Sequence, residues 1–565
     1  MALAPLPSQD EITEWYVAGT LPRQLAQYYE DRVKFADYCV DLHNRGAIDL
    51  VRIPLQESFA SLQTHPFFTA QTFFCGVIPR LKSSAIPMMR CCQALVLQAG
   101  ADGAAGQPNL AFRAWCQNNP REAEFVVELA RSGDEVAGKS VTFALQALNQ
   151  IAVAVEFVRT YADERRVFGM TALAGMAYAD ERSAMTALAA LEPFVGHTIE
   201  DRVRANALIS AFEVLQKQAV SQVAARLIDD AVIEPQANTL YALARILSTA
   251  RTLLAEVYIS KILKALENVD PEHSGTFRVL DLSLWELLRT NYWELAIGYL
   301  SAKLKTERVQ LSSFSSTVEE LSRGDPERLF AVVVRWLLSS SLYLSLRVDE
   351  LVGLDRRSLP FDSSVKSFDL SATEQVFLCR KAIGFLFIKP VVCSSMIVSV
   401  LRAAQDEAED QIIDLLFDPV LTNYSGEALD YLNSIRAPDS SFSAVQTAIA
   451  RINSYHAAIE GVGAIKELFP SEHQRNIVQA RTHDTMKSAM SGAQRKSVFR
   501  DLIHRSTVLY GKSSLAYVAD GDGNMRPVPI ELKSVGTSFE LPRGEVLDPV
   551  GLDYTLRVFK VEGPK

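Results

Sequence analysis

Apolar and polar positions follow a helical period along most of this chain. From about residue 8 to about residue 510, apolar side chains recur at spacings of three and four, which places them on one face of a helix. Short segments rich in Gly, Pro, Asp or Ser interrupt the pattern and predict turns between helices. The pattern does not alternate helices with buried strands, as a parallel sheet would require. The sequence therefore predicts a mainly α chain.

Between about residues 130 and 270 the helical pattern repeats in register. Each copy has an apolar anchor with small residues four and eight positions later, which lets a neighbouring helix approach closely. The anchors lie about 35 residues apart, the length of one helix pair. Acidic residues precede three of the four anchors, where they favour a helix N-terminus. The copies are Val136, Ser140, Ala144 and Leu145; Val167, Thr171, Gly175 and Met176; Val203, Ala207, Ala211 and Phe212; and Leu240, Ala244, Ser248 and Thr249.

The third copy begins within residues 201–208, Asp-Arg-Val-Arg-Ala-Asn-Ala-Leu. This segment resembles the second helix of HEAT-type helical repeats, which often begins with an acidic residue, then Val-Arg, then Ala and Leu at helical spacing. The first copy departs from that pattern, because Ala137 stands where Arg is usual. The resemblance is one of fold and implies a HEAT-like α-solenoid, a right-handed superhelix of helix pairs.

Breaks in the pattern divide the chain into regions. The longest irregular stretch is expected to form a loop or hinge, and a basic segment near residue 470 marks another change. The expected regions are irregular helical repeats over 1–130, HEAT-like repeats over 131–470 with a hinge loop at 355–371, a basic helical cap over 471–512 and a β-element over 513–565.

The last fifty residues read as β-structure. Ser514–Ala519 and Val528–Val535 have strand-like composition and flank the turn sequence Asp520–Asn524, which predicts a hairpin. Further strands are expected over Ser538–Arg543 and Tyr554–Val561. Because a lone hairpin is marginal in water, we expect the tail to pack on the last helices or to add to a partner's sheet.

One motif suggests nucleotide chemistry. Residues 133–140, Gly-Asp-Glu-Val-Ala-Gly-Lys-Ser, match the phosphate-loop pattern of NTPases in full. A phosphate loop follows a buried strand, but residues 122–131 have the charge pattern of an amphipathic helix. The acidic pair after the first glycine would also repel a polyphosphate. We therefore interpret Gly133 as part of an inter-helix turn, Lys139 as a solvent-facing charge and Ser140 as a contact between helices.

Two alternatives for the C-terminal hairpin involve a metal. Four residues, Asp520, Asp522, Asn524 and Glu531, occupy positions 1, 3, 5 and 12 of a calcium loop, but Met525 replaces the glycine that such a loop needs. Asp520 or Asp522, taken with Glu531-x-Lys533, is similar to the D…E-x-K signature of magnesium-dependent nucleases. The fold of those nucleases is a sheet with helices on both sides. The residues that remain after the hairpin are too few to form it. We assign no metal ligand here.

Charge and cysteine content narrow the class of protein. The formal net charge of −10 argues against a nucleic-acid binder as a whole, although a local basic patch can still dock an acidic partner. Seven cysteines without a Cys-x-x-Cys spacing predict free, buried thiols in a reducing compartment. The candidate partner-binding basic patch consists of Arg495, Lys496, Arg500 and Arg505.

Localisation follows from the N-terminus and from the most apolar segment. The first ten residues lack the basic start and apolar core of a signal peptide. Ala382–Leu401 is mostly apolar, but Lys389 and Pro390 divide it into two short runs that suit buried helices better than a membrane span. We therefore expect a cytoplasmic protein without membrane insertion.

These features favour a non-enzymatic scaffold or adaptor that binds a protein partner or a macromolecular complex. Nucleic acid is the less favoured partner, and no catalytic residue, cofactor or metal is assigned. The alternative is an enzyme, either an NTPase through residues 133–140 or a metal-dependent nuclease through Glu531 and its neighbours. The sequence specifies neither the partner nor the oligomeric state.

Overall fold

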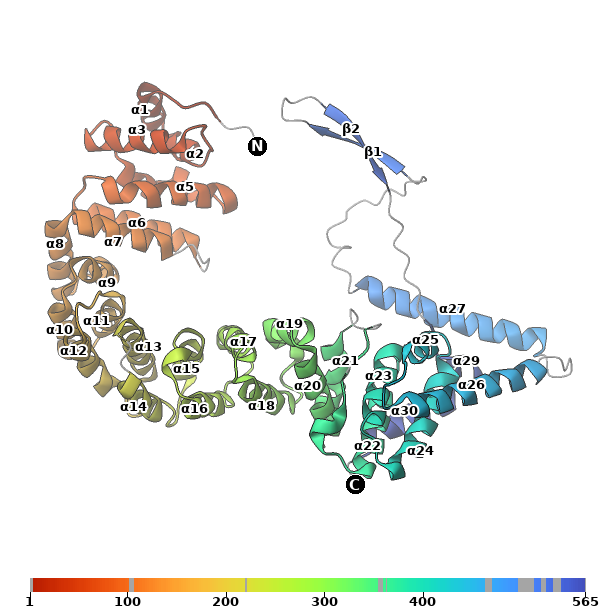
Figure 1. Ribbon diagram of the computed structural model, residues 1–565. Helices are drawn as coiled ribbons and strands as arrows, with labels where there is room; N and C mark the ends of the chain where they lie inside the picture. The colour runs from red at the N-terminus through yellow and green to blue at the C-terminus, as the bar shows by residue number, and fades with distance from the viewer. Residues whose placement is uncertain are drawn as a thin grey trace. The chain divides into compact units, whose positions relative to one another are not determined.

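The fold is taken from a computed structural model of the chain. It describes residues 4–100, 106–218, 221–353, 359–361, 363–462, 470–495, 513–519, 525–531 and 540–563. The chain divides into two compact units, residues 1–303 with 312–317, and residues 304–311 with 318–565. Both units are built mainly of helices, so the prediction of a mainly α chain is confirmed (Figure 1).

The first unit is a series of short helices joined by tight connections. Its helices are α1 (Gln9–Val17), α2 (Leu21–Leu25), α3 (Arg32–Asn44), α4 (Glu57–Ala60), α5 (Thr64–Val77), α6 (Ala85–Ala99), α7 (Gln107–Asn118), α8 (Pro120–Arg131), α9 (Glu135–Leu148), α10 (Ile151–Thr160), α11 (Glu164–Gly175), α12 (Glu181–Leu191), α13 (Asp201–Gln218), α14 (Ser221–Ala231), α15 (Ala237–Thr249), α16 (Glu256–Leu266) and α17 (Ser274–Leu288). Helices α18 (Trp293–Leu304) and α19 (Ser315–Arg323) contribute residues to both units.

Helices of the first unit pack as sequential pairs in two layers. The odd-numbered helices from α7 to α17 form one layer, in which each packs on the next odd-numbered helix (Figure 1). In the second layer α8 packs on α9, α10 on α11, α12 on α13 and α16 on α15. Since each pair packs on the next along the chain, the arrangement is that of a helical repeat.

The four copies of the sequence repeat lie on α9, α11, α13 and α15, which pack on one another in that order. Ser140, Ala207 and Ala244 are buried between helices, as the stripe of small residues predicts. A side chain on Gly175 would place its Cβ 2.0 Å from Nε2 of Gln146. The stripe is incomplete at its weaker positions, because Thr171 and Thr249 are exposed.

Acidic side chains begin two of these helices, as the sequence predicts. The Asp134 carboxylate accepts a hydrogen bond from the backbone N–H of Ala137 at 2.8 Å and caps α9. The Asp163 carboxylate accepts one from the N–H of Arg165 at 3.0 Å and caps α11. Each carboxylate satisfies a backbone donor that the first helical turn leaves without a partner.

The second unit continues with helices in the same pairwise manner. Helices α20, α22, α24 and α26 pack in succession, and α23 packs on α22 and α25. Its helices are α20 (Pro326–Leu338), α21 (Leu342–Val352), α22 (Ala372–Leu386), α23 (Pro390–Leu401), α24 (Asp406–Leu415), α25 (Glu427–Ser434), α26 (Phe442–Val462), α27 (Glu472–Arg495), α29 (Gly544–Leu547) and α30 (Pro549–Val561).

The most apolar part of the chain forms the centre of this unit. Every residue of α23 is buried, and the segment Ala382–Leu401 is divided between α22 and α23 at Lys389. Across the residues that the structure describes, every helix is too short or too polar to cross a bilayer. In the predicted hinge loop, Phe361 and Val365 are buried in the unit, and its role as a hinge stays a prediction.

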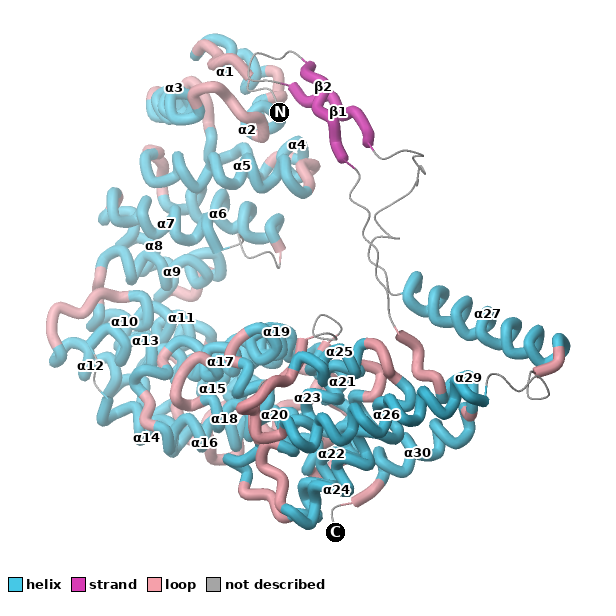
Figure 2. Tube along the Cα trace, turned by 45° about the vertical axis from the view of Figure 1, so that its right-hand side comes forward, coloured by secondary structure: helices cyan, strands magenta, loops and turns pink. Residues whose placement is uncertain are grey.

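Two short strands pair near the C-terminus. Strands β1 (Ser513–Ala519) and β2 (Met525–Glu531) are antiparallel, with Ser513 opposite Glu531 and Ala519 opposite Met525. They are drawn in magenta in Figure 2. The turn that the sequence predicts between them, residues 520–524, lies outside the described residues.

The prediction of a strand over Tyr554–Val561 is wrong, because these residues belong to helix α30. Asp548 caps this helix through the N–H of Gly551 at 3.0 Å, and Pro549 occupies its first position. Of the strand expected over Ser538–Arg543, the described residues 540–543 form a loop and a turn instead. The region 513–565 is therefore not a purely β element.

Candidate interaction site

The phosphate-loop octapeptide is the start of a helix. Residues 135–140 belong to α9, and the segment before them is helix α8 rather than a strand. The Lys139 ammonium lies 2.8 Å from the Glu135 carboxylate on the exposed surface. Ser140 is buried and accepts a hydrogen bond from Nε2 of Gln93 at 3.3 Å. The predicted roles of these residues as a turn, a surface charge and an inter-helix contact are thus confirmed.

The other predicted sites fall mostly outside the described residues. Asp520, Asp522 and Lys533 lie outside them, while Glu531 ends β2. Among the side chains that are described, no three His, Cys, Asp or Glu residues gather closely enough to hold a metal ion. Of the basic patch, only the backbone of Arg495 is described, as the last residue of α27, and Lys496, Arg500 and Arg505 lie beyond it.

The cysteines are free, and all but one are buried. Cys75 is half-buried, and the other six are buried in helix contacts. Burial raises the pKa of the Cys39 and Cys116 thiols to about 12. At neutral pH these thiols are protonated and behave as small apolar groups.

Acidic side chains connect one helix of the stack to the start of another. Oδ1 of Asp201 on α13 accepts hydrogen bonds from the backbone N–H and the hydroxyl of Thr239 on α15, at 3.0 and 2.6 Å. Its Oδ2 accepts one from the N–H of Asn238 at 2.7 Å. Burial acts to raise the pKa of Asp201, but the hydrogen bonds from Thr239 and Asn238 outweigh it and lower that pKa.

Basic side chains connect helices at their C-terminal ends. The buried guanidinium of Arg204 donates to the backbone carbonyls of Val195, Asp230 and Ile233 at 2.8 to 2.9 Å. The buried ammonium of Lys303 donates to the carbonyls of Glu267 and Val269 at 2.8 and 2.9 Å. A cation is stabilised there by the partial negative charge of unpaired carbonyls at a helix end, although burial still lowers the pKa of Lys303.

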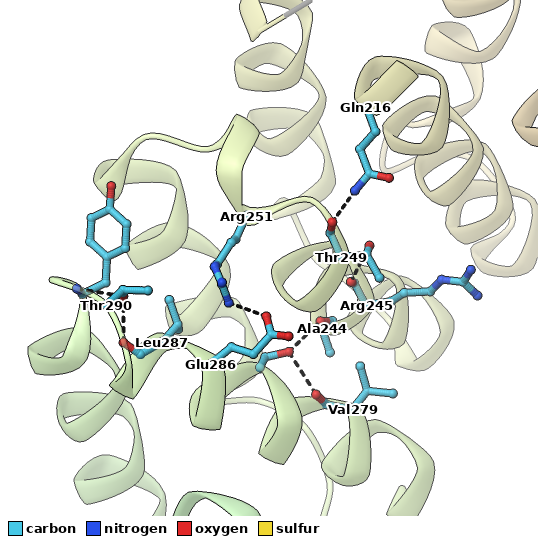
Figure 3. A network of polar contacts seen from close by, with 11 residues as sticks. Gln216, Ala244, Arg245, Thr249, Arg251, Val279, Glu286, Leu287 and Thr290 are labelled. Carbon is cyan, nitrogen blue, oxygen red and sulfur yellow. Dashed lines mark hydrogen bonds and ion pairs between the residues drawn. The ribbon is translucent and has the colours of Figure 1, made fainter. Parts of the chain in front are cut away.

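Smaller polar contacts join the helices of one layer. Figure 3 shows this network across α13, α15 and α17. The hydroxyl of Ser283 lies 3.1 Å from the carbonyl of Ala244 on the neighbouring helix. Arg251 pairs with Glu286, and the amide of Gln216 donates to the carbonyl of Thr249. These contacts satisfy polar groups at helix surfaces that pack closely.

The C-terminal segment 540–563 docks on other helices of the second unit, α22 and α25, through a surface that we call the C-terminal seam. At one end, the Glu540 carboxylate accepts hydrogen bonds from the backbone N–H groups of Gly426 and Glu427 at 2.9 and 2.8 Å. These N–H groups lie at the start of α25, where a negative charge is favourable. The N–H of Gly544 donates to Oδ1 of Asn423 at 2.7 Å, next to this contact.

At the other end of the seam, α30 packs on α22. The buried Lys381 ammonium donates to the carbonyl of Lys560 at 2.7 Å, and the Arg380 guanidinium lies 3.0 Å from the Glu562 carboxylate. Burial lowers the pKa of Lys381, and the Glu562 charge acts in the opposite direction. A Cβ on Gly384 would lie 3.1 Å from the Lys560 backbone nitrogen, so the two helices are in close contact.

Sequence reasoning missed this seam. The signal was present locally, because Asp548 and Pro549 are a helix start and Leu552, Leu556 and Phe559 have helical spacing. The alternation of Tyr554, Leu556 and Val558 with the polar residues Thr555 and Arg557 favoured a strand instead.

Two small cavities border the seam. One, of about 290 Å³, is lined by residues that include Phe377, Arg380, Gln411 and Glu562. The other, of about 110 Å³, is lined by residues that include Ser345 and Lys381.

No family model matches the chain, and it has no match among the curated proteins or the solved structures.

Proposed function

We propose that the chain is a non-enzymatic scaffold or adaptor that binds another protein through the surface of a HEAT-like helical repeat. The main support for this proposal is the position of the charged side chains in the helix stack. Asp201, Arg204 and Lys303 hold the ends of neighbouring helices instead of converging on a common pocket. A repeat held in this way presents a long row of helix surfaces to a partner.

The HEAT type of repeat is supported by the position of Arg204. It stands in the Val-Arg part of the segment that resembles HEAT repeats, and it is buried against the end of α14. The anchors of four copies also lie on helices that pack in sequence, from α9 to α15. The copies of the sequence repeat thus coincide with successive helix pairs.

The C-terminal hairpin offers a second binding mode, the addition of a partner strand. Pro527 and Pro529 lie in β2 and have no backbone N–H to donate. Prolines in strands are found where the N–H would face away from the neighbouring strand. A partner strand would therefore add beside β1, whose outer edge keeps its backbone N–H donors.

The basic patch from Arg495 to Arg505 would attract an acidic partner surface.

The proposal is tested by affinity capture with the full chain from an extract of its source, followed by binding measurements with the purified partner. One variant replaces residues 513–531 with a Gly/Ser linker and keeps the docked segment 540–563. Another reverses the basic patch to Glu, with reversal of the exposed Arg52 and Arg323 as the matched control. We expect saturable binding of a protein partner. At least one of the two variants should weaken this binding, and the control should not.

Enzymatic activity would contradict the proposal. ATP or GTP binding that is lost in Lys139→Ala would restore the NTPase interpretation. Magnesium-dependent cleavage of DNA or RNA that is lost in Glu531→Ala would restore the nuclease interpretation.

A further inference from the structure

The C-terminal seam differs from other contacts between helices in the distance along the chain that it closes. Asp201 and Thr239, which join neighbouring pairs, are 38 positions apart. Arg380 and Glu562 are 182 positions apart, and Glu540 and Gly426 are 114 apart. Because α22 keeps its own neighbours α20 and α24, the segment can leave without separating them.

The surface of α22 is shaped to receive a helix. Gly384 has no side chain, and this lets the backbone of α30 come close at Lys560. Lys381 as a whole is only 4% exposed, and its ammonium donates a hydrogen bond to the last turn of the docked helix. Taking an ammonium out of water is costly unless a partner compensates it, and a helix C-terminus supplies that compensation.

The docked segment has the pattern of a helix that binds in a groove. Leu552, Leu556 and Phe559 follow the spacing i, i+4 and i+7 and are buried or half-buried. Glu562 lies just beyond the end of the helix and pairs with Arg380. The docked segment therefore has three apolar positions at helical spacing and an acidic residue after its last turn.

The hold on α30 is limited, because much of its apolar surface faces away from α22. The side chains of Val550, Tyr554 and Val561 are 78%, 69% and 71% exposed. Among the described residues of α30, only Leu552 is buried. Segments with few buried apolar contacts open at a lower free energy than the core of the same protein.

We propose that the C-terminal seam is a helix-binding site whose resident ligand is the chain's own segment 540–563. A partner protein occupies it with a helix of the pattern Leu-x₃-Leu-x₂-Phe-x₂-Glu and displaces α30. This inference rests on the proposed function, because it names the site at which the scaffold takes its partner.

The test uses the full chain and a fluorescent peptide with the sequence of residues 540–563, measured by anisotropy. In the variant Leu552→Asp/Phe559→Asp, the resident helix leaves and the site is free. We expect this variant to bind the peptide at least tenfold more tightly than the unchanged chain. Addition of Gly384→Leu should abolish the binding, because the new side chain fills the space of the Lys560 backbone. The control Val550→Asp/Tyr554→Asp changes the outward face and should bind as the unchanged chain does.

Absence of binding by the freed variant, or equal binding with Gly384→Leu, would overturn the proposal. If the double variant does not fold, a protease site between residues 531 and 540 serves the same purpose. After cleavage of the full chain, the released segment should exchange with the labelled peptide, and retention without exchange overturns the proposal. The peptide experiment needs no partner protein. A failure of the peptide to bind can therefore be told apart from a failure to find the scaffold's partner.

Discussion

The Arg380 guanidinium and the Glu562 carboxylate form a 3.0 Å ion pair across 182 positions of the chain. Contacts between residues so far apart along the chain are not typical of a helical repeat, in which each pair of helices contacts only its neighbours. The contact of Asp201 with Thr239, from one pair to the next, is typical of that local order. The described residues therefore combine a locally held stack with a distant contact between α22 and the segment 540–563.

The Asp201 contact should contribute measurably to the stability of the first unit. Asp201→Asn leaves the hydroxyl and backbone donors of the buried Thr239 with a weaker acceptor. Loss of such a buried hydrogen-bond partner costs about 1–3 kcal/mol. We expect a lower melting temperature by circular dichroism. Glu200→Gln, in an exposed side chain one position earlier, is the matched control and should have a much smaller effect.

The same carboxylate predicts a pH dependence. The pKa of Asp201 is lowered from its ordinary value of 3.8 in the folded chain, so its contribution is fully present above pH 3.8. The contribution is lost as the pH falls below 3.8 and through the lower folded pKa. The difference in melting temperature between the unchanged chain and Asp201→Asn should therefore shrink in this acid range. A constant difference from pH 7 to pH 2 would contradict the assignment.

Two glycines in the stack should respond in opposite ways to alanine. At Gly138 a Cβ would meet Phe168 at an ordinary 3.5 Å, so Gly138→Ala should stabilise the helix by up to about 1 kcal/mol. At Gly175 a Cβ would collide with Gln146, whose amide donates to the Thr171 carbonyl at 3.1 Å. Gly175→Ala should therefore lower the melting temperature.

Gly138 also separates the two interpretations of the octapeptide. In a phosphate loop this position is a glycine because the backbone must approach the phosphates closely. Tolerance of Gly138→Ala, with every binding property retained, is the result expected of a helix start. Loss of nucleotide binding in this variant, at unchanged melting temperature, would contradict it.

The thiols should differ in reactivity according to burial. Burial raises the pKa of Cys393 to about 12, and that of the half-buried Cys75 to about 11. Both are protonated at neutral pH, so access decides the rate. We expect Cys75 to react first with a thiol reagent and the other six to react only after unfolding. Cys75→Ser should remove the early phase, and its persistence would show that another thiol is accessible.

Local patterns in the sequence were sufficient to predict most of the helical architecture. The stripe at Ser140, Ala207 and Ala244 indicates helices that pack in order, because each contact depends on residues about one repeat away. The acidic residues Asp134 and Asp163 mark helix starts for a reason confined to a single turn.

The C-terminal seam could not be predicted in the same way. The side chains of α30 alternate well enough to suggest a strand, and the helix is completed by contacts with Lys381 and Gly384, far back in the chain. Only the fold brings these residues together. Asp548 and Pro549 mark the start of this helix locally, but they do not indicate the surface on which it docks.

The central claim is that a locally held stack carries a separately docked C-terminal helix. Hydrogen exchange of the full chain, with and without Gly384→Leu, tests it most directly. Leu is a better helix former than Gly, so α22 itself should not be weakened. We expect faster exchange in residues 540–563 and at the surface they cover, with α9 to α17 unchanged. Faster exchange throughout the chain, or no change in residues 540–563, would contradict it.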